Sequence, residues 1–234
     1  MRDFLERAAS AVLGLTAVVI AIVVVHREFF DSPPARGQPK SEYVKEWRSI
    51  LPAGRLVGSA RAPVTLVEFT DLQCPFCRQF NGIVQRVRRQ FPNDVAYVFV
   101  HTPIRSHPYA LSAARAAECA QSFGRFSEMV DAIYERQDSL GSKPWTSYAL
   151  SAGINDTMSF GRCARDTVPL PAVQSGLELS KRINVIGTPT VILNGWRYGV
   201  APGDSELVSA IKSLLDGKKP YRSFPTSELV HRGS

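Results

Sequence analysis

The sequence has few of the residues that build metal sites. Its 234 residues include only four cysteines and four histidines. Cys74 and Cys77 form a Cys-x-x-Cys pair, but no second pair of this kind follows it. A tetrahedral zinc site needs about four such ligands, so we expect no bound metal, although half of a zinc site remains an alternative interpretation of the pair.

Basic residues are numerous, yet no basic cluster interleaved with aromatics is found. The formal net charge is +7, from 28 Lys and Arg against 21 Asp and Glu. The basic side chains are scattered along the chain, which is typical of a solvated surface. This pattern argues against a nucleic-acid partner and is compatible with anionic membranes or acidic client proteins.

Long apolar runs are rare too, with one exception near the start. Residues 8–25 contain no charged side chain and are long enough to cross a bilayer as a helix. No Ala-x-Ala cleavage site follows, which favours an uncleaved single-pass anchor over residues 1–30 against a cleaved signal peptide. Arg and Lys flank the run on both sides, so the charge count does not settle its orientation.

A linker and a short helix should follow, over residues 31–56. Four Pro and Gly residues between positions 31 and 40 predict an extended tether. Ser41 is a candidate N-cap for an amphipathic helix through Leu51, which Pro52 would end.

The chemistry is concentrated where a strand meets a helix. The β-branched and apolar run Val64 to Thr70 predicts a buried strand, and the segment from Pro75 to Phe91 has apolar residues at helical spacing. Cys74 would then be the N-cap, where unpaired backbone N–H groups and the helix dipole favour a thiolate. Cys77, one turn later, could close a disulfide with Cys74 or resolve a mixed disulfide formed there.

These residues carry a resemblance to a known family. Glu68, Cys74-Pro75-Phe76-Cys77 and the distant Gly187-Thr188-Pro189-Thr190 resemble the thioredoxin superfamily, and specifically its DsbA-like branch, over about Val57 to Asp216. The resemblance implies an α/β thioredoxin fold with an inserted helical domain, here preceded by an N-terminal transmembrane helix.

Family roles carry over to the matching positions. The resemblance implies that Cys74 and Cys77 are catalytic and that Glu68 is a buried carboxylate that relays a proton near Cys77; a Glu at a strand edge facing water is the alternative. It also implies a cis Thr188-Pro189 bond beside the dithiol. Client proteins should bind at four residues: Pro75, Phe76, Thr188 and Pro189.

The resemblance divides the chain into consecutive parts. The first part of the thioredoxin-like domain is expected over residues 57–106, and its second part over 168–217. Between them, residues 107–167 lose the strand signal and contain Ala-rich helical segments, which fits the inserted helical domain. Residues 218–234 should form a polar tail.

Two local signals lie in the second part of the thioredoxin-like domain. Asn194-Gly195 fits a two-residue hairpin turn between strands. A closing helix is expected from Asp204 to Leu215, with Asp204 as its cap.

A second pair of cysteines lies in this helical segment. Cys119 and Cys163 are 163 − 119 = 44 positions apart. A disulfide between them would close the insertion and stabilise the fold by about 4 kcal/mol in the chain-entropy model. The alternative is two buried free thiols that act as small apolar side chains.

We therefore predict an enzyme, a membrane-tethered thiol-disulfide oxidoreductase whose catalytic domain faces the extracytoplasmic side of the cell membrane. It should need no cofactor beyond the redox-active Cys74–Cys77 disulfide. Its partners should be exported client proteins and a quinone-linked membrane thiol oxidase, DsbB-like or similar to vitamin K epoxide reductase.

The direction of electron flow stays open at this point. The Pro75-Phe76 dipeptide lacks the His that strongly oxidising relatives carry between the cysteines. Oxidation of clients is the first hypothesis, and a reductase or isomerase role is the second. A non-catalytic binding module that keeps the fold is a third hypothesis of another class.

Overall fold

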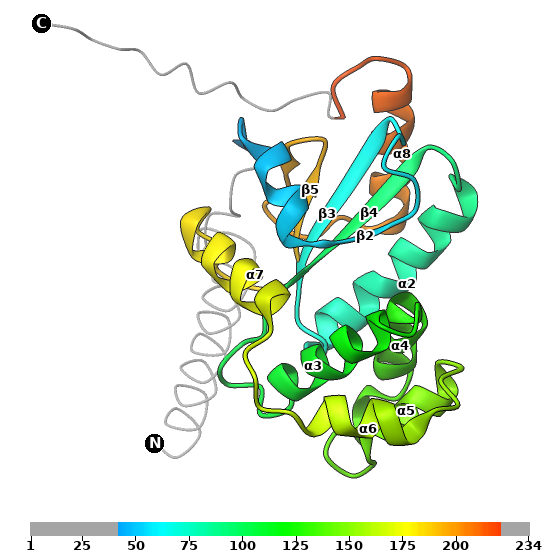
Figure 1. Cartoon of the computed structure of the whole chain (residues 1–234). Coiled ribbons are helices and arrows are strands. Elements are labelled where there is room, and N and C mark those ends of the chain that lie inside the picture. Colours follow the sequence, from blue (N-terminus) through cyan, green and yellow to red (C-terminus); the bar gives the residue numbers. More distant parts are fainter. Residues whose placement is uncertain (1–41, 221–234) are drawn as a thin grey trace, which may run out of the picture. The chain divides into compact units, whose positions relative to one another are not determined.

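The computed structural model describes residues 42–220 (Figure 1). The predicted anchor, the predicted tether and the end of the tail lie outside the described residues. Between residues 42 and 220, no helix is both long enough and apolar enough to cross a membrane.

A twisted sheet forms the centre of the described part (Figure 1). Its strand order is β1-β6-β5-β3-β4-β2. The central strand β3 runs parallel to β4 and antiparallel to β5. The strands are β1 (Glu42–Tyr43), β2 (Arg55–Val57), β3 (Val64–Thr70), β4 (Val95–His101), β5 (Thr190–Leu193) and β6 (Trp196–Arg197). The predicted strand Val64 to Thr70 is confirmed.

Helices cover both faces of the sheet, so β3 is buried on both sides. On one face lie α2 (Pro75–Gln90) and α8 (Asp204–Leu215), packed against Leu66 and its neighbours. On the other face, α7 (Pro171–Arg182) and the 3₁₀ helix η1 (Trp47–Ala53) pack against Val67 and its neighbours. Because side chains alternate along a strand, Glu68 points to the α2 side together with Leu66.

The helical segment lies between β4 and α7, at the bottom of Figure 1. Its helices are α3 (Ala110–Gln121), α4 (Phe126–Glu135), η2 (Gln137–Ser139), α5 (Trp145–Ser151) and α6 (Thr157–Arg165). Small residues line α3, where Ala113, Ala116, Ala117 and Ala120 are fully buried. They allow α3 to approach its neighbours closely, and the segment shares one apolar core with α2.

Three local predictions can be compared with the structure. The predicted helix from Ser41 to Leu51 is wrong: within the described residues the chain forms β1 and then η1, which includes Pro52. A 3₁₀ helix buries Trp47 and Ile50 on one face because residues three apart eclipse each other. The predicted hairpin at Asn194-Gly195 is confirmed, with φ of 45° and 90° at these residues. The cap of α8 is Gly203, and not Asp204 as we expected.

Candidate active site

Cys74 lies where β3 passes into α2. It is the N-cap of α2, with extended backbone angles, and Pro75 occupies the first helical position. Its backbone N–H donates to the Asp71 carbonyl over 3.0 Å, which closes the turn that precedes the helix. Cys74 and Cys77 are both free thiols and both buried. The site therefore holds the pair in its reduced form.

The environment of Cys74 favours its thiolate. A hydrogen bond from the Cys77 thiol is the largest contribution that lowers the pKa of Cys74, to about 5, and burial works against it. The Thr188 side chain and the backbone N–H groups of Cys77 and Phe76 lower the pKa further. The two backbone N–H groups belong to the first turn of α2, where a helix leaves its amides unpaired.

Cys77 has the opposite character. Its side chain is completely buried. Burial raises the pKa of Cys77 far above its usual value, and the neighbouring Cys74 and Glu68 raise it further. Cys77 therefore keeps its proton while Cys74 ionises, and the two thiols of one motif differ strongly in reactivity.

Glu68 is buried beneath the pair, with an exposed fraction of 1%. Burial raises its pKa to about 7, and the nearby hydroxyls of Tyr97 and Thr70 partly offset this. The carboxylate Oε2 accepts a hydrogen bond of 2.6 Å from the Tyr97 hydroxyl. A Glu at a water-facing strand edge is therefore the wrong interpretation, because this carboxyl points into the core.

The cis-proline loop lies against the dithiol. The Thr188-Pro189 bond is cis, as the resemblance implied. The Cys74 thiol contacts the Thr188 carbonyl at 3.4 Å between sulfur and oxygen. This contact brings together two segments that are 114 positions apart in the sequence.

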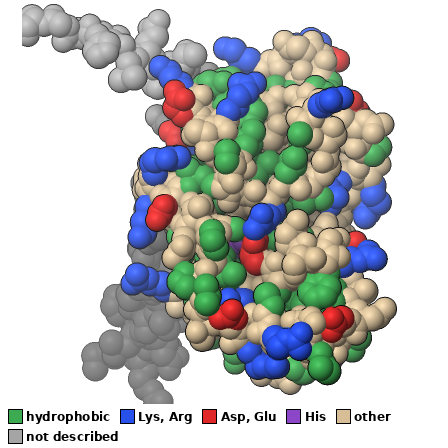
Figure 2. Space-filling view, viewed as in Figure 1, with side chains coloured by type: hydrophobic (Ala, Val, Ile, Leu, Met, Phe, Trp, Pro, Cys, Tyr) green, Lys and Arg blue, Asp and Glu red, His purple; other side chains and the backbone are tan. Residues whose placement is uncertain are grey.

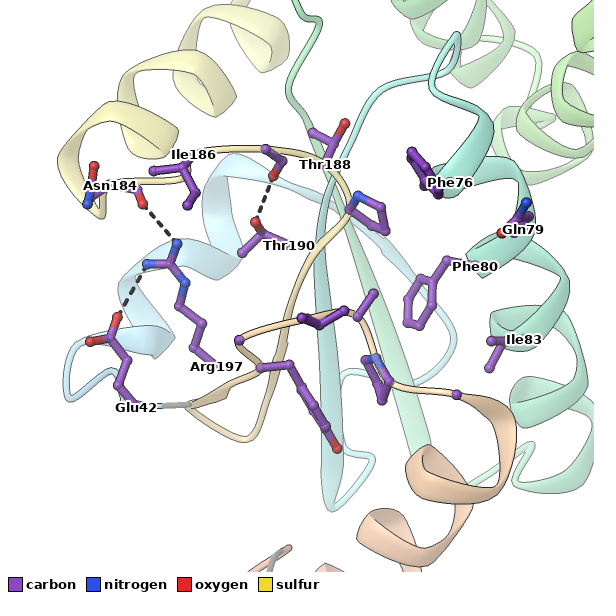
Figure 3. Close-up of a pocket in the computed structure, with 18 residues that line it drawn as sticks. Glu42, Phe76, Gln79, Phe80, Ile83, Asn184, Ile186, Thr188, Thr190 and Arg197 are labelled. Atoms are coloured by element: carbon purple, nitrogen blue, oxygen red, sulfur yellow. Dashed lines mark hydrogen bonds and ion pairs between the residues drawn. The ribbon is translucent and has the colours of Figure 1, made fainter. Parts of the chain in front are cut away.

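An open groove of about 610 Å³ extends from this contact. Figure 3 shows Phe76, Phe80 and Ile83 of α2 on one side of it, and Ile186 and Thr188 of the cis-proline loop on the other. Many of the residues that line it are apolar or glycine. The groove can hold an extended segment that carries apolar side chains next to a cysteine.

Apolar residues at the groove are unusually exposed. The exposed fractions are 64% for Phe76, 77% for Ile186 and 61% for Val200. Over the face in Figure 2, apolar side chains alternate with scattered basic and acidic ones. An exposed apolar rim around a reactive thiol is typical of a surface that contacts other proteins.

The sequence did not point to two groups that hold the turn before Cys74. The buried amide of Gln137, in η2, donates to the carbonyls of Leu72 and Cys74, both over 3.0 Å. The buried Asp71 carboxylate accepts from the backbone N–H groups of Gln73 and Ile104, each over 2.7 Å. Neither residue belongs to a motif, and no local pattern could have found them.

The two histidines near the end of β4 bind different carboxylates. His107 Nδ1 lies 2.9 Å from Asp71 Oδ2, and His101 Nε2 lies 3.0 Å from Glu118 Oε1. Glu118 also pairs with Arg55. Their His-x5-His spacing therefore does not bring them to one site, and residues 42–220 contain no group of three His, Cys, Asp or Glu placed to hold a metal ion.

The other two cysteines are bonded to each other. Cys119 of α3 and Cys163 of α6 form a disulfide with their Cα atoms 5.9 Å apart. Neither residue lines the groove. The pairing that the sequence suggested is thus present, and it joins the first and last helices of the insertion.

Comparison with known proteins decides the family. A sequence model described as thioredoxin matches residues 51–213, well over half of the chain. The chain belongs to the thioredoxin family. The matched range includes the dithiol, the helical segment and the cis-proline loop, so the resemblance seen in the motifs extends over most of the described residues.

Curated relatives carry a different name. The chain is 37% identical over 217 residues to a Na⁺/H⁺ antiporter NhaA 1 of Mycolicibacterium gilvum, covering 91% of this chain and 34% of the relative. It is 31% identical over 218 residues to an antiporter NhaA 1 of Mycolicibacterium vanbaalenii, covering 92% and 35%. The chain thus spans about a third of the length of these relatives.

Solved structures share the fold. BdbD from Bacillus subtilis, in its oxidised form, has a TM-score of 0.65 at 22% identity, covering 76% of this chain and 99% of that one. Wolbachia pipientis alpha-DsbA1 has a TM-score of 0.61 at 18% identity, covering 71% and 93%. The predicted α/β thioredoxin fold with a helical insertion is confirmed, and so, at the level of the fold, is the likeness to DsbA. The predicted oxidoreductase class agrees with these matches.

Proposed function

We propose that this protein is a thiol-disulfide oxidoreductase that oxidises exported client proteins through Cys74 and Cys77. The observation that carries the proposal is the position of Cys74 at the N-cap of α2, where the Cys77 thiol and the first-turn amides lower the pKa of Cys74 to about 5. A couple whose reduced form is stabilised in this way accepts electrons more readily from client thiols. This supports oxidation of clients although no His lies between the cysteines.

The reaction begins with the Cys74–Cys77 disulfide. A client thiolate attacks the Cys74 sulfur, a new S–S bond joins client and enzyme, and Cys77 leaves with the electron pair. Because the pKa of Cys77 is strongly raised by burial, the leaving sulfur takes up a proton. We assign the donor as Glu68, which interacts electrostatically with Cys77 and whose pKa of about 7 lets it hold a proton near neutral pH.

The second half of the reaction releases the client. A second client thiolate attacks the client sulfur of the mixed disulfide, and Cys74 leaves as a stabilised thiolate. Two client thiols have become one disulfide, and the two electrons now rest on the reduced Cys74 and Cys77. The low pKa of Cys74 makes it a good leaving group in this step.

The groove supplies the binding surface for the client in this proposal. The Thr188 carbonyl contacts the Cys74 sulfur, Pro189 and Phe76 line the groove, and Pro75 follows Cys74 at the first position of α2. An extended client segment that lies along the loop can place its cysteine at Cys74 and an apolar neighbour in the groove.

The proposal also includes the cellular location of the reaction and the partner that reoxidises the dithiol. Residues 1–30 would anchor the domain at the extracytoplasmic side of the membrane, and a quinone-linked membrane thiol oxidase would return the dithiol to the disulfide. The antiporter activity named for the relatives is no part of this proposal, because this chain spans about a third of their length. A reductase or isomerase of exported proteins is the second candidate, favoured by the absence of His between Cys74 and Cys77.

The deciding experiment compares both directions with one preparation. The oxidised protein should rapidly introduce disulfides into a reduced, unfolded client, whereas the reduced protein should cleave client disulfides slowly. Faster reduction than oxidation would support the reductase. Absence of exchange in both directions, together with an unreactive Cys74, would support a binding module instead.

A further inference from the structure

The Tyr97 hydroxyl fixes one oxygen of the buried Glu68 carboxyl. Tyr97 lies on β4 and is 4% exposed, and Glu68 lies on the adjacent strand β3 and is 1% exposed. The hydroxyl donates to Glu68 Oε2 over 2.6 Å. The other oxygen, Oε1, is buried and has no hydrogen-bond partner among the described residues. One oxygen is therefore occupied and the other is free to exchange a proton.

Among the groups around Glu68, Tyr97 is its main hydrogen-bond partner. Cys74 at the N-cap of α2 and Cys77 in its first turn interact with it electrostatically, and from α4 the buried Tyr134 does so. The Thr70 hydroxyl, on the same strand, is already engaged with Tyr134 at 2.8 Å. Within residues 42–220, Glu68 forms no ion pair with a basic side chain.

We propose that Tyr97 is a positioning residue that orients Glu68 so that its free oxygen Oε1 exchanges the proton of Cys77. The inference rests on the proposed function, because it concerns the proton that the exchange reaction must move. Tyr97 does not touch the client or the sulfurs in this account, and it acts through Glu68.

In the direction that closes the disulfide, the proton moves from Cys77 to Glu68. Glu68 Oε1 takes the proton from the Cys77 thiol, and the Cys77 thiolate attacks Cys74 of a mixed disulfide. The Cys74–Cys77 bond forms, and the partner thiolate leaves with the electron pair of the broken bond. In the opposite direction the protonated Glu68 returns its proton to Cys77 as that sulfur leaves.

Two opposing effects on the pKa of Glu68 explain why the Tyr97 hydroxyl is needed. Burial raises the pKa of Glu68 to about 7, and the hydrogen bond from Tyr97 is the largest effect that lowers it. Because the hydroxyl donates to the charged form, its removal raises the pKa of Glu68 further. Glu68 would then stay protonated at neutral pH and could no longer accept the Cys77 proton.

Tyr97→Phe with a direct titration of Glu68 tests the inference. The substitution removes only the hydroxyl and keeps the ring, which packs edge-on against Phe99 at 6.4 Å. The carboxyl is followed by ¹³C NMR in the oxidised protein, and Glu68→Gln assigns its signal. We expect the midpoint to rise by roughly one to two pH units, since a hydrogen bond to a charged group is lost.

The matched control is Tyr134→Phe. It removes another buried hydroxyl, one that bonds to Thr70 and the Asp71 carbonyl instead of Glu68. Its Glu68 midpoint should not rise, because the hydroxyl that donates to Glu68 is still present. An unchanged midpoint in Tyr97→Phe, or an equal rise in Tyr134→Phe, would overturn the inference.

A kinetic measurement connects the titration to the reaction. A mixed disulfide between Cys74 and glutathione is formed, and release of glutathione by Cys77 is followed against pH. Its midpoint should rise in Tyr97→Phe together with the NMR midpoint, and Tyr97→Phe should cause no further shift in a Glu68→Gln background. An unchanged kinetic midpoint, or the same shift in that background, would refute the positioning role.

Failure of the proposed function gives a different pattern. If the wild-type protein exchanges no disulfides with protein clients, the function is wrong, while the glutathione and NMR measurements still report on Tyr97. If it oxidises clients and Tyr97→Phe shifts neither midpoint, only the inference about Tyr97 is wrong.

Discussion

Two cysteine pairs in the same chain show how position determines what a thiol does. Cys74 and Cys77 lie at the start of α2, where unpaired backbone N–H groups stabilise one thiolate and burial suppresses the other. Cys119 and Cys163 lie within helices whose amides are already bonded, and they close a loop of 44 positions. The first pair is arranged for exchange and the second for stability.

The largest expected effect concerns the division of labour within the reactive pair. Cys74→Ser should reduce client oxidation to the uncatalysed rate, because the only thiol with a lowered pKa is removed. Cys77→Ser should instead trap mixed disulfides with clients at Cys74, visible on non-reducing gels. Adducts that accumulate on the Cys74→Ser protein would reverse the assignment.

The second effect concerns the pair in the insertion. Replacing both Cys119 and Cys163 with Ala should lower the free energy of unfolding by about 4 kcal/mol, since the unfolded chain is no longer cross-linked. Alkylation of Cys74 should proceed at the wild-type rate. Denaturant unfolding and reaction with iodoacetamide check the two parts, and a slower Cys74 in a folded variant would show that the pairs are not independent.

A third prediction concerns the free energy of unfolding, which the buried Glu68 carboxyl lowers above neutral pH. The pKa of Glu68 is about 7 in the folded protein and near 4.3 in an unfolded chain. Between these two pKa values the folded state binds more protons than the unfolded state. The contribution of Glu68 to the stability of the fold is therefore complete below the unfolded pKa, and it is lost as the pH rises through about 7. Glu68→Gln should therefore be more stable than wild type at pH 8 by about 3 kcal/mol.

The check is unfolding by denaturant at two pH values. The gain should nearly vanish at pH 4, where the wild-type carboxyl is protonated in the folded state and mostly protonated in the unfolded state. A gain of the same size at both pH values would mean that Glu68→Gln acts through packing and not through charge.

The smallest expected effect concerns Gln137, which connects the helical insertion to the turn before Cys74. Gln137→Leu removes the amide that bonds to the carbonyls of Leu72 and Cys74. Leaving these groups unpaired should cost about 1–2 kcal/mol and change the alkylation rate of Cys74 a few-fold. Gln121→Leu, at an exposed position of α3, is the control and should change neither quantity. Equal behaviour of the two variants would show that the insertion does not support the turn.

Much of this architecture could be predicted because the signals are local. A continuous β-branched run specified β3, the Cys-Pro pair marked the start of α2, and Asn194-Gly195 marked a hairpin turn. The short strand β2 was not predicted, because three residues at the edge of a sheet show no periodicity in the sequence. The helix predicted from Ser41 was wrong, since Trp47 and Ile50, three apart, fit a 3₁₀ helix equally well.

The site was predictable only where it coincided with a motif. Cys74, Cys77 and the cis Thr188-Pro189 bond belong to one. Gln137 and Tyr97 lie on elements that are remote in sequence from the dithiol motif. An isolated Gln or Tyr in a helix or strand is not a specific signal, because such residues occur in many structural roles. Their contacts depend on how the insertion folds back and on the register of β4 against β3, which only the structure supplies.

The central claim is that Cys74 alone is the activated thiol, and one measurement tests it directly. The reduced protein is alkylated with iodoacetamide over a range of pH, and the modified cysteine is identified by peptide mass spectrometry. The account predicts that Cys74 is modified with a midpoint near pH 5 while Cys77 stays unmodified. Modification of Cys77, or a midpoint for Cys74 near the ordinary thiol value of about 8.5, would contradict it.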